Sequence, residues 1–135
     1  MRNTLWIDGI AFYRLVAGHL GIIKKTVKFG PMEKDQKILL QIKKSVKEIE
    51  PKSEIILYGS RARGDEREDS DWDLLILVPY AAGIREEQKF RHKLFEVELQ
   101  FGQAISTLVK SKEEWEGKFQ ITPLYQNIKQ EGIVI

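Results

Sequence analysis

Apolar residues recur every three or four positions from Asp35 onward, and lysines fill the positions between them. This spacing predicts an amphipathic helix that ends before Pro51, with an apolar stripe made of Ile38, Leu39, Ile42, Val46 and Ile49. Two β-prone runs follow, from Glu54 to Tyr58 and from Asp71 to Val78. The second run ends in residues that are apolar on both faces, which is typical of a strand in the middle of a covered sheet.

The segment from Ile84 to Phe101 fits two patterns. Phe90, Leu94, Val97 and Phe101 follow a helical stripe, yet the residues from Phe95 to Phe101 also alternate as in a strand. A run of 18 residues without a turn signal favours the helix. Gly102 is expected to end it.

The remaining segments are shorter. Ala104 to Val109 predicts a third strand, and Ser111 with Glu114 forms a capping box for a short helix. Thr122-Pro123 opens a last helix that ends at Gly132. Arg61 to Ser70 is polar and predicts a loop. The whole pattern predicts a single α+β domain with a mixed β-sheet flanked by helices.

The first part of the chain is patterned differently. Ile10 to Ile23 is apolar but is interrupted by Arg14 and His19, so it cannot span a membrane and lacks the core of a signal peptide. We expect a peripheral helix or a loosely held extension. Met32, directly after Gly30-Pro31, is a candidate natural start, so residues 1–31 are assigned to an N-terminal extension that need not belong to the native domain, and residues 32–135 to the domain itself.

Composition narrows the possible functions. The chain has 135 residues, with 22 basic and 20 acidic side chains, and this balance argues against a dedicated nucleic-acid binder. It has no cysteine, which excludes disulfides and thiolate metal sites and fits a reducing compartment, so we expect a cytoplasmic protein. His19 and His92 are too far apart in sequence to form a metal-ligand spacing.

Candidate chemistry lies between the first two predicted strands. The first strand ends at Gly59-Ser60, where a glycine lets the backbone approach a ligand closely and the serine offers a hydroxyl and an N–H group. Arg61 and Arg63 add positive charge suited to phosphate oxygens. A Gly-Ser turn alone is commonplace, and the charged residues after it also fit a plain surface loop.

The second strand begins with an acidic pair. Asp71 and Asp73 are two residues apart, so both side chains leave the strand on one face while Trp72 points to the other. Two carboxylates this close repel each other unless a cation lies between them, and Mg²⁺ or Mn²⁺ suits oxygen ligands and can bridge to phosphates. The order of strand, Gly-Ser, loop and Asp-x-Asp therefore predicts a site for a metal and a nucleotide.

These residues resemble the signature of the nucleotidyltransferase superfamily with the DNA polymerase β-like fold, and especially its minimal nucleotidyltransferase (MNT) domains, which are often encoded beside HEPN proteins. The similarity runs from Gly59 to Ile76. It implies that Asp71 and Asp73 bind the metal and act in catalysis with Ser60, and that Gly59, Ser60, Arg61 and Arg63 contact the nucleoside triphosphate. It also implies transfer of AMP from ATP, or of another nucleoside monophosphate, to a hydroxyl group.

One position departs from the family pattern. The family commonly carries a third acid on the next strand, where this chain has Ser106 and Thr107. A hydroxyl cannot replace the charge of a carboxylate. Glu96 or Glu98 compensates only if the preceding segment points one of them inward.

Three functions remain open on these grounds. The first is an MNT-type enzyme that modifies a hydroxyl of a partner protein, with a HEPN-type helical protein as the expected partner and antitoxin activity as the consequence. The second is a non-catalytic antitoxin or regulatory nucleotide-binding module, favoured by the missing acid. The third is a small-molecule nucleotidyltransferase, which is disfavoured because few residues follow Val109. An oligomer fits all three.

Overall fold

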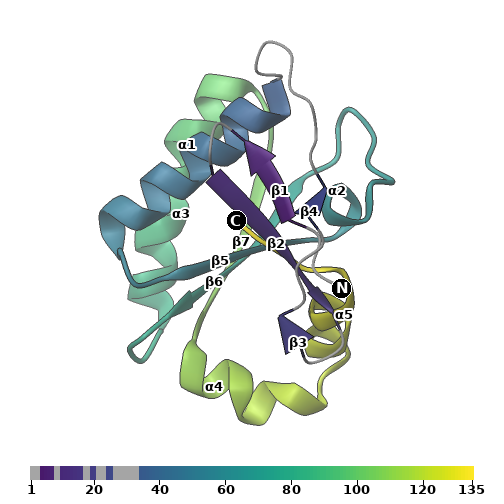
Figure 1. Ribbon diagram of the computed structural model, residues 1–135. Helices are drawn as coiled ribbons and strands as arrows, with labels where there is room; N and C mark the ends of the chain where they lie inside the picture. The colour runs from purple at the N-terminus through teal and green to yellow at the C-terminus, as the bar shows by residue number, and fades with distance from the viewer. Residues whose placement is uncertain (1–3, 8–9, 17–18, 21–23, 26–33) are drawn as a thin grey trace.

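The computed structural model describes residues 4–7, 10–16, 19–20, 24–25 and 34–135. Its helices are α1 (Lys34–Ile49), α2 (Ser60–Arg63), α3 (Ile84–Phe101), α4 (Lys112–Glu116) and α5 (Pro123–Glu131), with a 3-10 turn, η1 (Lys118–Ile121). Its strands are β1 (Thr4–Ile7), β2 (Ile10–Val16), β3 (His19–Leu20), β4 (Lys24–Lys25), β5 (Glu54–Tyr58), β6 (Trp72–Val78), β7 (Ile105–Ser111) and β8 (Ile133–Val134). Figure 1 shows how the helices surround the sheet.

The sheet is mixed, as predicted. β5 pairs antiparallel with β6, so that Tyr58 lies opposite Asp73, and β6 pairs parallel with β7, so that Asp73 lies opposite Ser106. β8 pairs antiparallel with the other side of β5. The order β8-β5-β6-β7 places β6 in the interior of the sheet and confirms the α+β fold.

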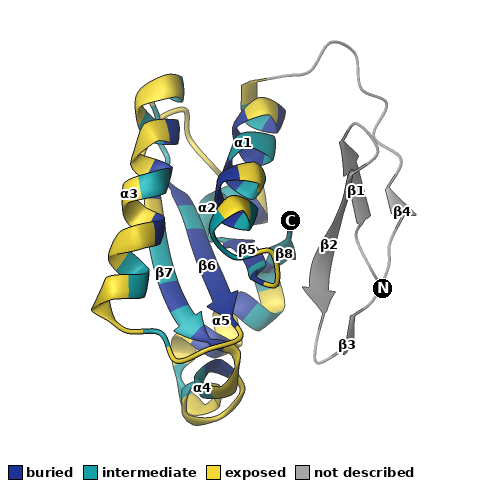
Figure 2. Ribbon diagram, turned by 90° about the vertical axis from the view of Figure 1, so that its left-hand side faces the viewer, coloured by how far each residue is buried: buried dark blue, intermediate teal, exposed yellow. Residues whose placement is uncertain are grey.

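Both faces of β6 are covered by helices, which explains its unbroken apolar sequence. Trp72, Leu74, Ile76 and Val78 pack in the cluster that includes α1 and α3. Leu75 and Leu77 pack in a second cluster, on the opposite face, with Trp115, Tyr125 and Ile128 of α4 and α5. Figure 2 shows the strand buried between the helices. By the same alternation, Asp73 lies on the α4/α5 face, at the beginning of the strand.

The segment from Ile84 to Phe101 is helical, as its length indicated. Phe90, Leu94 and Val97 are buried against the sheet and α1, whereas Phe95 and Leu99 are 51% and 70% exposed. The alternating pattern would have buried Phe95 and Leu99, so the helical stripe, which buries three large side chains on one face, prevails. Gly102, with a φ of 64°, ends the helix in the left-handed conformation.

The predicted helix starts in the last third of the chain are confirmed. The Ser111 hydroxyl accepts a hydrogen bond from the Glu114 N–H, and the Thr122 hydroxyl accepts one from the Tyr125 N–H, with Pro123 at the first helical position. The third strand runs from Ile105 to Ser111, so it is displaced toward the C-terminus relative to the prediction.

Three short elements escaped prediction. The loop predicted from Arg61 to Ser70 begins with the single helical turn α2, whose polar residues carry no apolar period. η1 and β8 were not expected either. β8 consists of Ile133 and Val134 alone, which is too short to show alternation, and it is a strand because β5 offers it an edge to pair with.

Of the two expectations for Ile10 to Ile23, the peripheral helix is wrong, because Ile10–Val16 is the strand β2, and the loosely held extension stays a prediction. Its sequence, Ile-Ala-Phe-Tyr-Arg-Leu-Val, is rich in aromatic and β-branched residues, and β8 offers it a partner through Tyr13 opposite Val134. The proposed domain boundary before Met32 lies outside the described residues.

Candidate active site

The corner after β5 is formed by Gly59, whose backbone angles are a φ of 73° and a ψ of −159°. Residues other than glycine rarely adopt these backbone angles. A Cβ at this position would lie 2.3 Å from Asp73 Oδ2, so the aspartate lies directly against the glycine backbone. The structure therefore brings the Gly-Ser corner and the second aspartate together, although 13 residues separate Ser60 from Asp73 in the sequence.

Ser60 begins α2 immediately after this corner and is half-buried. Its carbonyl oxygen accepts hydrogen bonds from the Gly64 N–H at 2.9 Å and from the Asp65 N–H at 3.1 Å. These bonds close the helical turn and fix the position of the serine. The backbone of Ser60 is thus held directly after Gly59, against which Asp73 lies.

The two aspartates occupy the same end of β6 but differ in exposure. Asp71 precedes the strand and is exposed, Asp73 is half-buried, and Trp72 between them is buried on the opposite face, as the alternation predicted. Burial, and then the neighbouring Asp71 carboxylate, raises the pKa of Asp73, while Arg63 opposes this rise. A cation next to the pair would offset the repulsion between the two carboxylates, which is the second cause of the rise in the pKa of Asp73.

Arg61 does not extend toward the aspartates. Its guanidinium lies 4.3 Å from the centre of the Trp72 ring, donates from Nε to the Ser70 carbonyl at 2.9 Å and lies 3.6 Å from Asp35 Oδ2. The side chain is 4% exposed. Its planar, stacked guanidinium thus ties α1, the loop and β6 together, and we assign it to positioning the corner.

Arg63 is exposed and lies on the side of the corner that faces α5. Its Nη1 donates to Glu131 Oε2 at 2.8 Å and its Nε to Asp65 Oδ2 at 3.1 Å. Both carboxylates raise the pKa of Arg63. The guanidinium is therefore near the site but already paired with two acids.

Glu131 is a residue that the sequence did not reveal. Its Oε1 accepts a hydrogen bond from the Gly59 N–H at 3.3 Å, and its charge contributes to the raised pKa values of Tyr58 and Asp73. As the last residue of α5, it places a negative charge where the helix dipole disfavours one. That unfavourable placement is the signal that could have found it.

The position of the expected third acid is occupied by Ser106. It lies opposite Asp73 on the neighbouring parallel strand and is exposed on the same face. Glu98 does not replace it, because its Oε1 accepts the Ile105 N–H at 2.7 Å. Glu96 lies at the exposed surface, 3.9 Å from Lys93 Nζ. Neither glutamate of α3 compensates for the missing acid.

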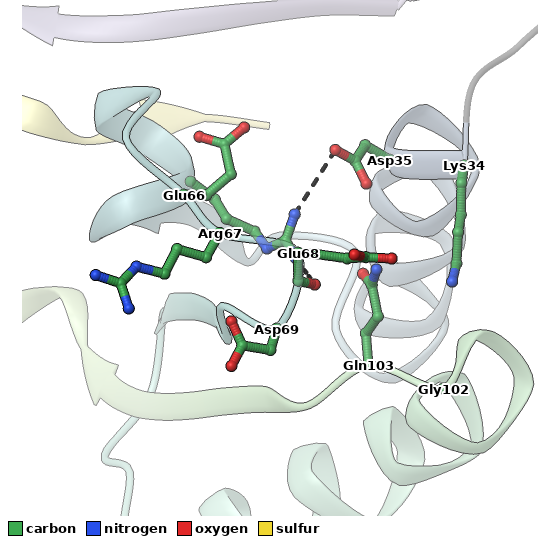
Figure 3. A pocket seen from close by; sticks show the side chains of 9 residues that line it. Lys34, Asp35, Glu66, Arg67, Glu68, Asp69, Gly102 and Gln103 are labelled. Atoms are coloured by element: carbon green, nitrogen blue, oxygen red, sulfur yellow. Dashed lines mark hydrogen bonds and ion pairs between the residues drawn. The ribbon is translucent and has the colours of Figure 1, made fainter.

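A pocket with a volume of about 790 Å³ lies on the other side of Arg61, between α1 and the loop. Figure 3 shows Lys34 and Asp35 of α1 on one side of it and Glu66 and Arg67 of the loop on the other. Its lining includes neither aspartate of the corner. Its mixed charges match the surface-loop interpretation of these residues.

The residues at the corner fit a divalent metal bound together with a nucleotide. Within the described part of the chain, no cluster of three or more histidine, cysteine, aspartate or glutamate side chains is arranged to hold a metal by itself. Mg²⁺ is usually held by one or two carboxylates and by the phosphates of the substrate, which needs no larger cluster. The close packing of Asp73 against the Gly59 backbone and the raised pKa of Asp73 fit that arrangement.

The sequence of the chain is similar to that of known proteins. The sequence profile of the nucleotidyltransferase domain family matches residues 39–135, a range that contains the corner, both aspartates and Glu131. A curated relative from Methanocaldococcus jannaschii, named "Putative protein adenylyltransferase MJ0141", is 35% identical over 77 residues, which are 56% of this chain and 78% of the relative. Among the described helices, none has the length and apolar character needed to cross a bilayer.

Proposed function

Because the chain belongs to the nucleotidyltransferase domain family, we propose that it transfers AMP from ATP to a hydroxyl group of a partner protein, with Mg²⁺ or Mn²⁺ as the cofactor. The family accounts for nucleotidyl transfer. The name of the archaeal relative supports adenylylation of a protein. The observation that supports the proposal is the contact of Asp73 with the backbone of Gly59, because the proposed metal ligand and the proposed phosphate-binding corner then lie side by side.

The charges at the corner support the need for a metal. Asp71, Asp73 and Glu131 lie around it, and Arg63, an exposed cation beside it, is paired with two carboxylates. A triphosphate approaching this group of acids is repelled. Divalent cations would neutralise both the aspartates and the phosphates, and this is the chemistry that the metal supplies when bound.

The residues of the chain would divide the work as follows. Asp71 and Asp73 would hold the metal, and Gly59 would let the phosphates approach the backbone. Ser60 would donate its hydroxyl and N–H to phosphate oxygens, and Arg63 would add charge. The acceptor oxygen would form a bond to the α-phosphorus, the bond from that phosphorus to the pyrophosphate oxygen would break, and the hydroxyl proton would pass to solvent water. Catalysis then rests on positioning and charge neutralisation.

The partner follows from the resemblance to MNT domains. We propose a HEPN-type helical protein whose toxicity is suppressed when one of its hydroxyl groups is adenylylated. A second candidate function, a non-catalytic antitoxin or regulatory module that binds the nucleotide and the partner, is favoured by Ser106, because this side chain cannot supply the charge of the family's third acid.

Transfer of label from α-labelled ATP to the co-encoded partner tests the enzyme. The wild type with Mg²⁺ should label the partner, and Asp71→Asn or Asp73→Asn should abolish labelling. Asp69→Asn is the matched control, since Asp69 is an exposed loop acid that lines the pocket on the other side of Arg61. No labelling by the wild type, with partner binding that survives both substitutions, would establish the non-catalytic module instead.

We further propose that residues 32–135 retain the fold without residues 1–31. The clusters that form the described core lie between Ile38 and Ile135. β2 adds two residue pairs to β8, which is a small part of the sheet. Limited proteolysis should trim the chain to about Met32 without a fall in melting temperature, and unfolding of the trimmed chain would refute the boundary.

A further inference from the structure

Glu131 accepts hydrogen bonds from groups at the corner that would also donate to a bound phosphate. Its two carboxylate oxygens accept from different donors, Oε1 from the Gly59 N–H and Oε2 from Arg63 Nη1. A phosphate of a bound nucleotide would present oxygens of the same charge and similar spacing to the same donors. The carboxylate and the phosphate therefore compete.

The sheet order shows that Glu131 is not a displaced third acid. Glu131 precedes β8 and reaches the corner from the β8 side of β5, whereas Ser106 lies beside Asp73 on β7. The two positions lie on opposite sides of the β5–β6 pair. Glu131 thus approaches the Gly-Ser backbone and Arg63, the part of the site assigned to phosphates.

We infer that Glu131 holds Arg63 and the Gly59 N–H in the nucleotide-free protein and releases them to the phosphates when the metal–ATP complex binds. Glu131 is then a positioning residue, which acts through Arg63 and not on the reacting atoms. This inference rests on the proposed nucleotide site. It adds that Arg63, an exposed cation at the site, is already paired with Glu131, so the phosphates must displace this carboxylate to reach it.

The alternative is that Glu131 only anchors the end of α5. The two roles predict different effects of one substitution on the affinity for the nucleotide. Glu131→Gln keeps the size and shape of the side chain but removes the charge that pairs with Arg63. Loss of an anchor can weaken nucleotide binding or leave it unchanged, whereas removal of a competitor strengthens it.

Calorimetric titration of Mg-ATP into the full-length protein measures this effect. Glu131→Gln should tighten binding by about fivefold, which is the upper end for releasing one solvent-accessible ion pair. Glu113→Gln is the matched control, because it makes the same change in net charge at an exposed position on α4, and it should leave the affinity unchanged. Arg63→Gln should weaken binding.

A double-mutant cycle then tests whether Glu131 acts through Arg63. In the Arg63→Gln background the gain from Glu131→Gln should fall below about twofold, since the shared partner is gone. In the wild type, the Nε–H resonance of Arg63 in ¹⁵N-arginine-labelled protein, assigned by its loss in Arg63→Gln, should shift when Mg-ATP is added. This second readout applies even if Glu131→Gln does not fold.

The outcomes separate the inference from the proposed function. Mg-ATP binding by the wild type, with unchanged or weaker binding by Glu131→Gln, overturns the inference alone, as does an Arg63 resonance that does not respond to Mg-ATP. Absence of binding by both the wild type and Glu131→Gln overturns the inference and the nucleotide site together. Tighter binding that depends on Arg63 supports both.

Discussion

Substitution of Gly59 by alanine tests the geometry of the corner. The backbone angles of Gly59 lie in a region used almost only by glycine, so an alanine there costs about 1–3 kcal/mol from the backbone alone. The new Cβ would lie 2.3 Å from Asp73 Oδ2 and must displace that carboxylate, at about 0.5–1.5 kcal/mol for an off-rotamer side chain. We expect a total loss of about 2–4 kcal/mol.

Gly64→Ala is a matched control for this substitution. Gly64 also has a positive φ, 82°, but a Cβ there meets no other atom within 4 Å. Its cost should be limited to about 1–2 kcal/mol of backbone strain. The difference between the two variants reports the contact with Asp73 together with the more restricted backbone conformation of Gly59.

Thermal unfolding and Mg-ATP titration measure the two consequences. At about 3 °C per kcal/mol for a chain of this size, Gly59→Ala should lower the melting temperature by about 6–12 °C and Gly64→Ala by about 3–6 °C. Gly59→Ala should also weaken Mg-ATP binding by at least about tenfold, and Gly64→Ala should not. Equal melting temperatures and equal affinities for the two variants would refute the reasoning.

Three further predictions concern other parts of the structure. Arg61→Lys should lower the free energy of unfolding by about 1 kcal/mol in a denaturant titration, because lysine cannot stack its charge on Trp72 with the same geometry. An unchanged unfolding midpoint would contradict the positioning role of Arg61. Phe90→Ala should cost about 3–5 kcal/mol in the same measurement, since Phe90 is fully buried between α3 and the sheet; a cost below about 1 kcal/mol would contradict that packing. The hydrogen bond from the Gly83 N–H to Glu86 lowers the pKa of Glu86 below its ordinary value of 4.5. The ionised Glu86 side chain therefore stabilises the protein above pH 4.5, and this stabilisation is lost as the pH falls through the lower folded pKa. The melting temperature of the wild type should exceed that of Glu86→Gln at pH 7 but not at pH 3. A difference of the same size at both pH values would contradict this role of Glu86.

Much of the fold could be predicted because its signals are local. The apolar stripe of α1, the apolar strand β6 and the caps at Ser111 and Thr122 each depend on residues close together in the sequence. β8 and β2 could not be predicted in the same way. β8 is too short to carry a pattern, and β2 pairs with β1 and with the distant β8, two partners that its own sequence does not reveal.

The same distinction between local and distant contacts applies to the candidate site. The proximity of Asp73 to Gly59 was predicted because the motif itself specifies a strand, a turn and a second strand. Glu131 was not predicted, since it lies 72 residues from Gly59 and meets it only through the path of α5. The environment of Arg61 was missed for a similar reason, because the motif indicates its charge but not its contacts with Trp72 and Asp35.

We propose that Asp73 and the Gly59-Ser60 corner form one metal-dependent nucleotide site. Calorimetric titration of ATP into the wild type and Asp73→Asn, with Mg²⁺ and with a chelator, is the sharpest test of this site. We predict binding by the wild type that requires Mg²⁺ and that Asp73→Asn weakens by at least about tenfold, as expected for loss of a metal-binding carboxylate. Equal binding of ATP with the chelator, or by Asp73→Asn with Mg²⁺, would contradict it.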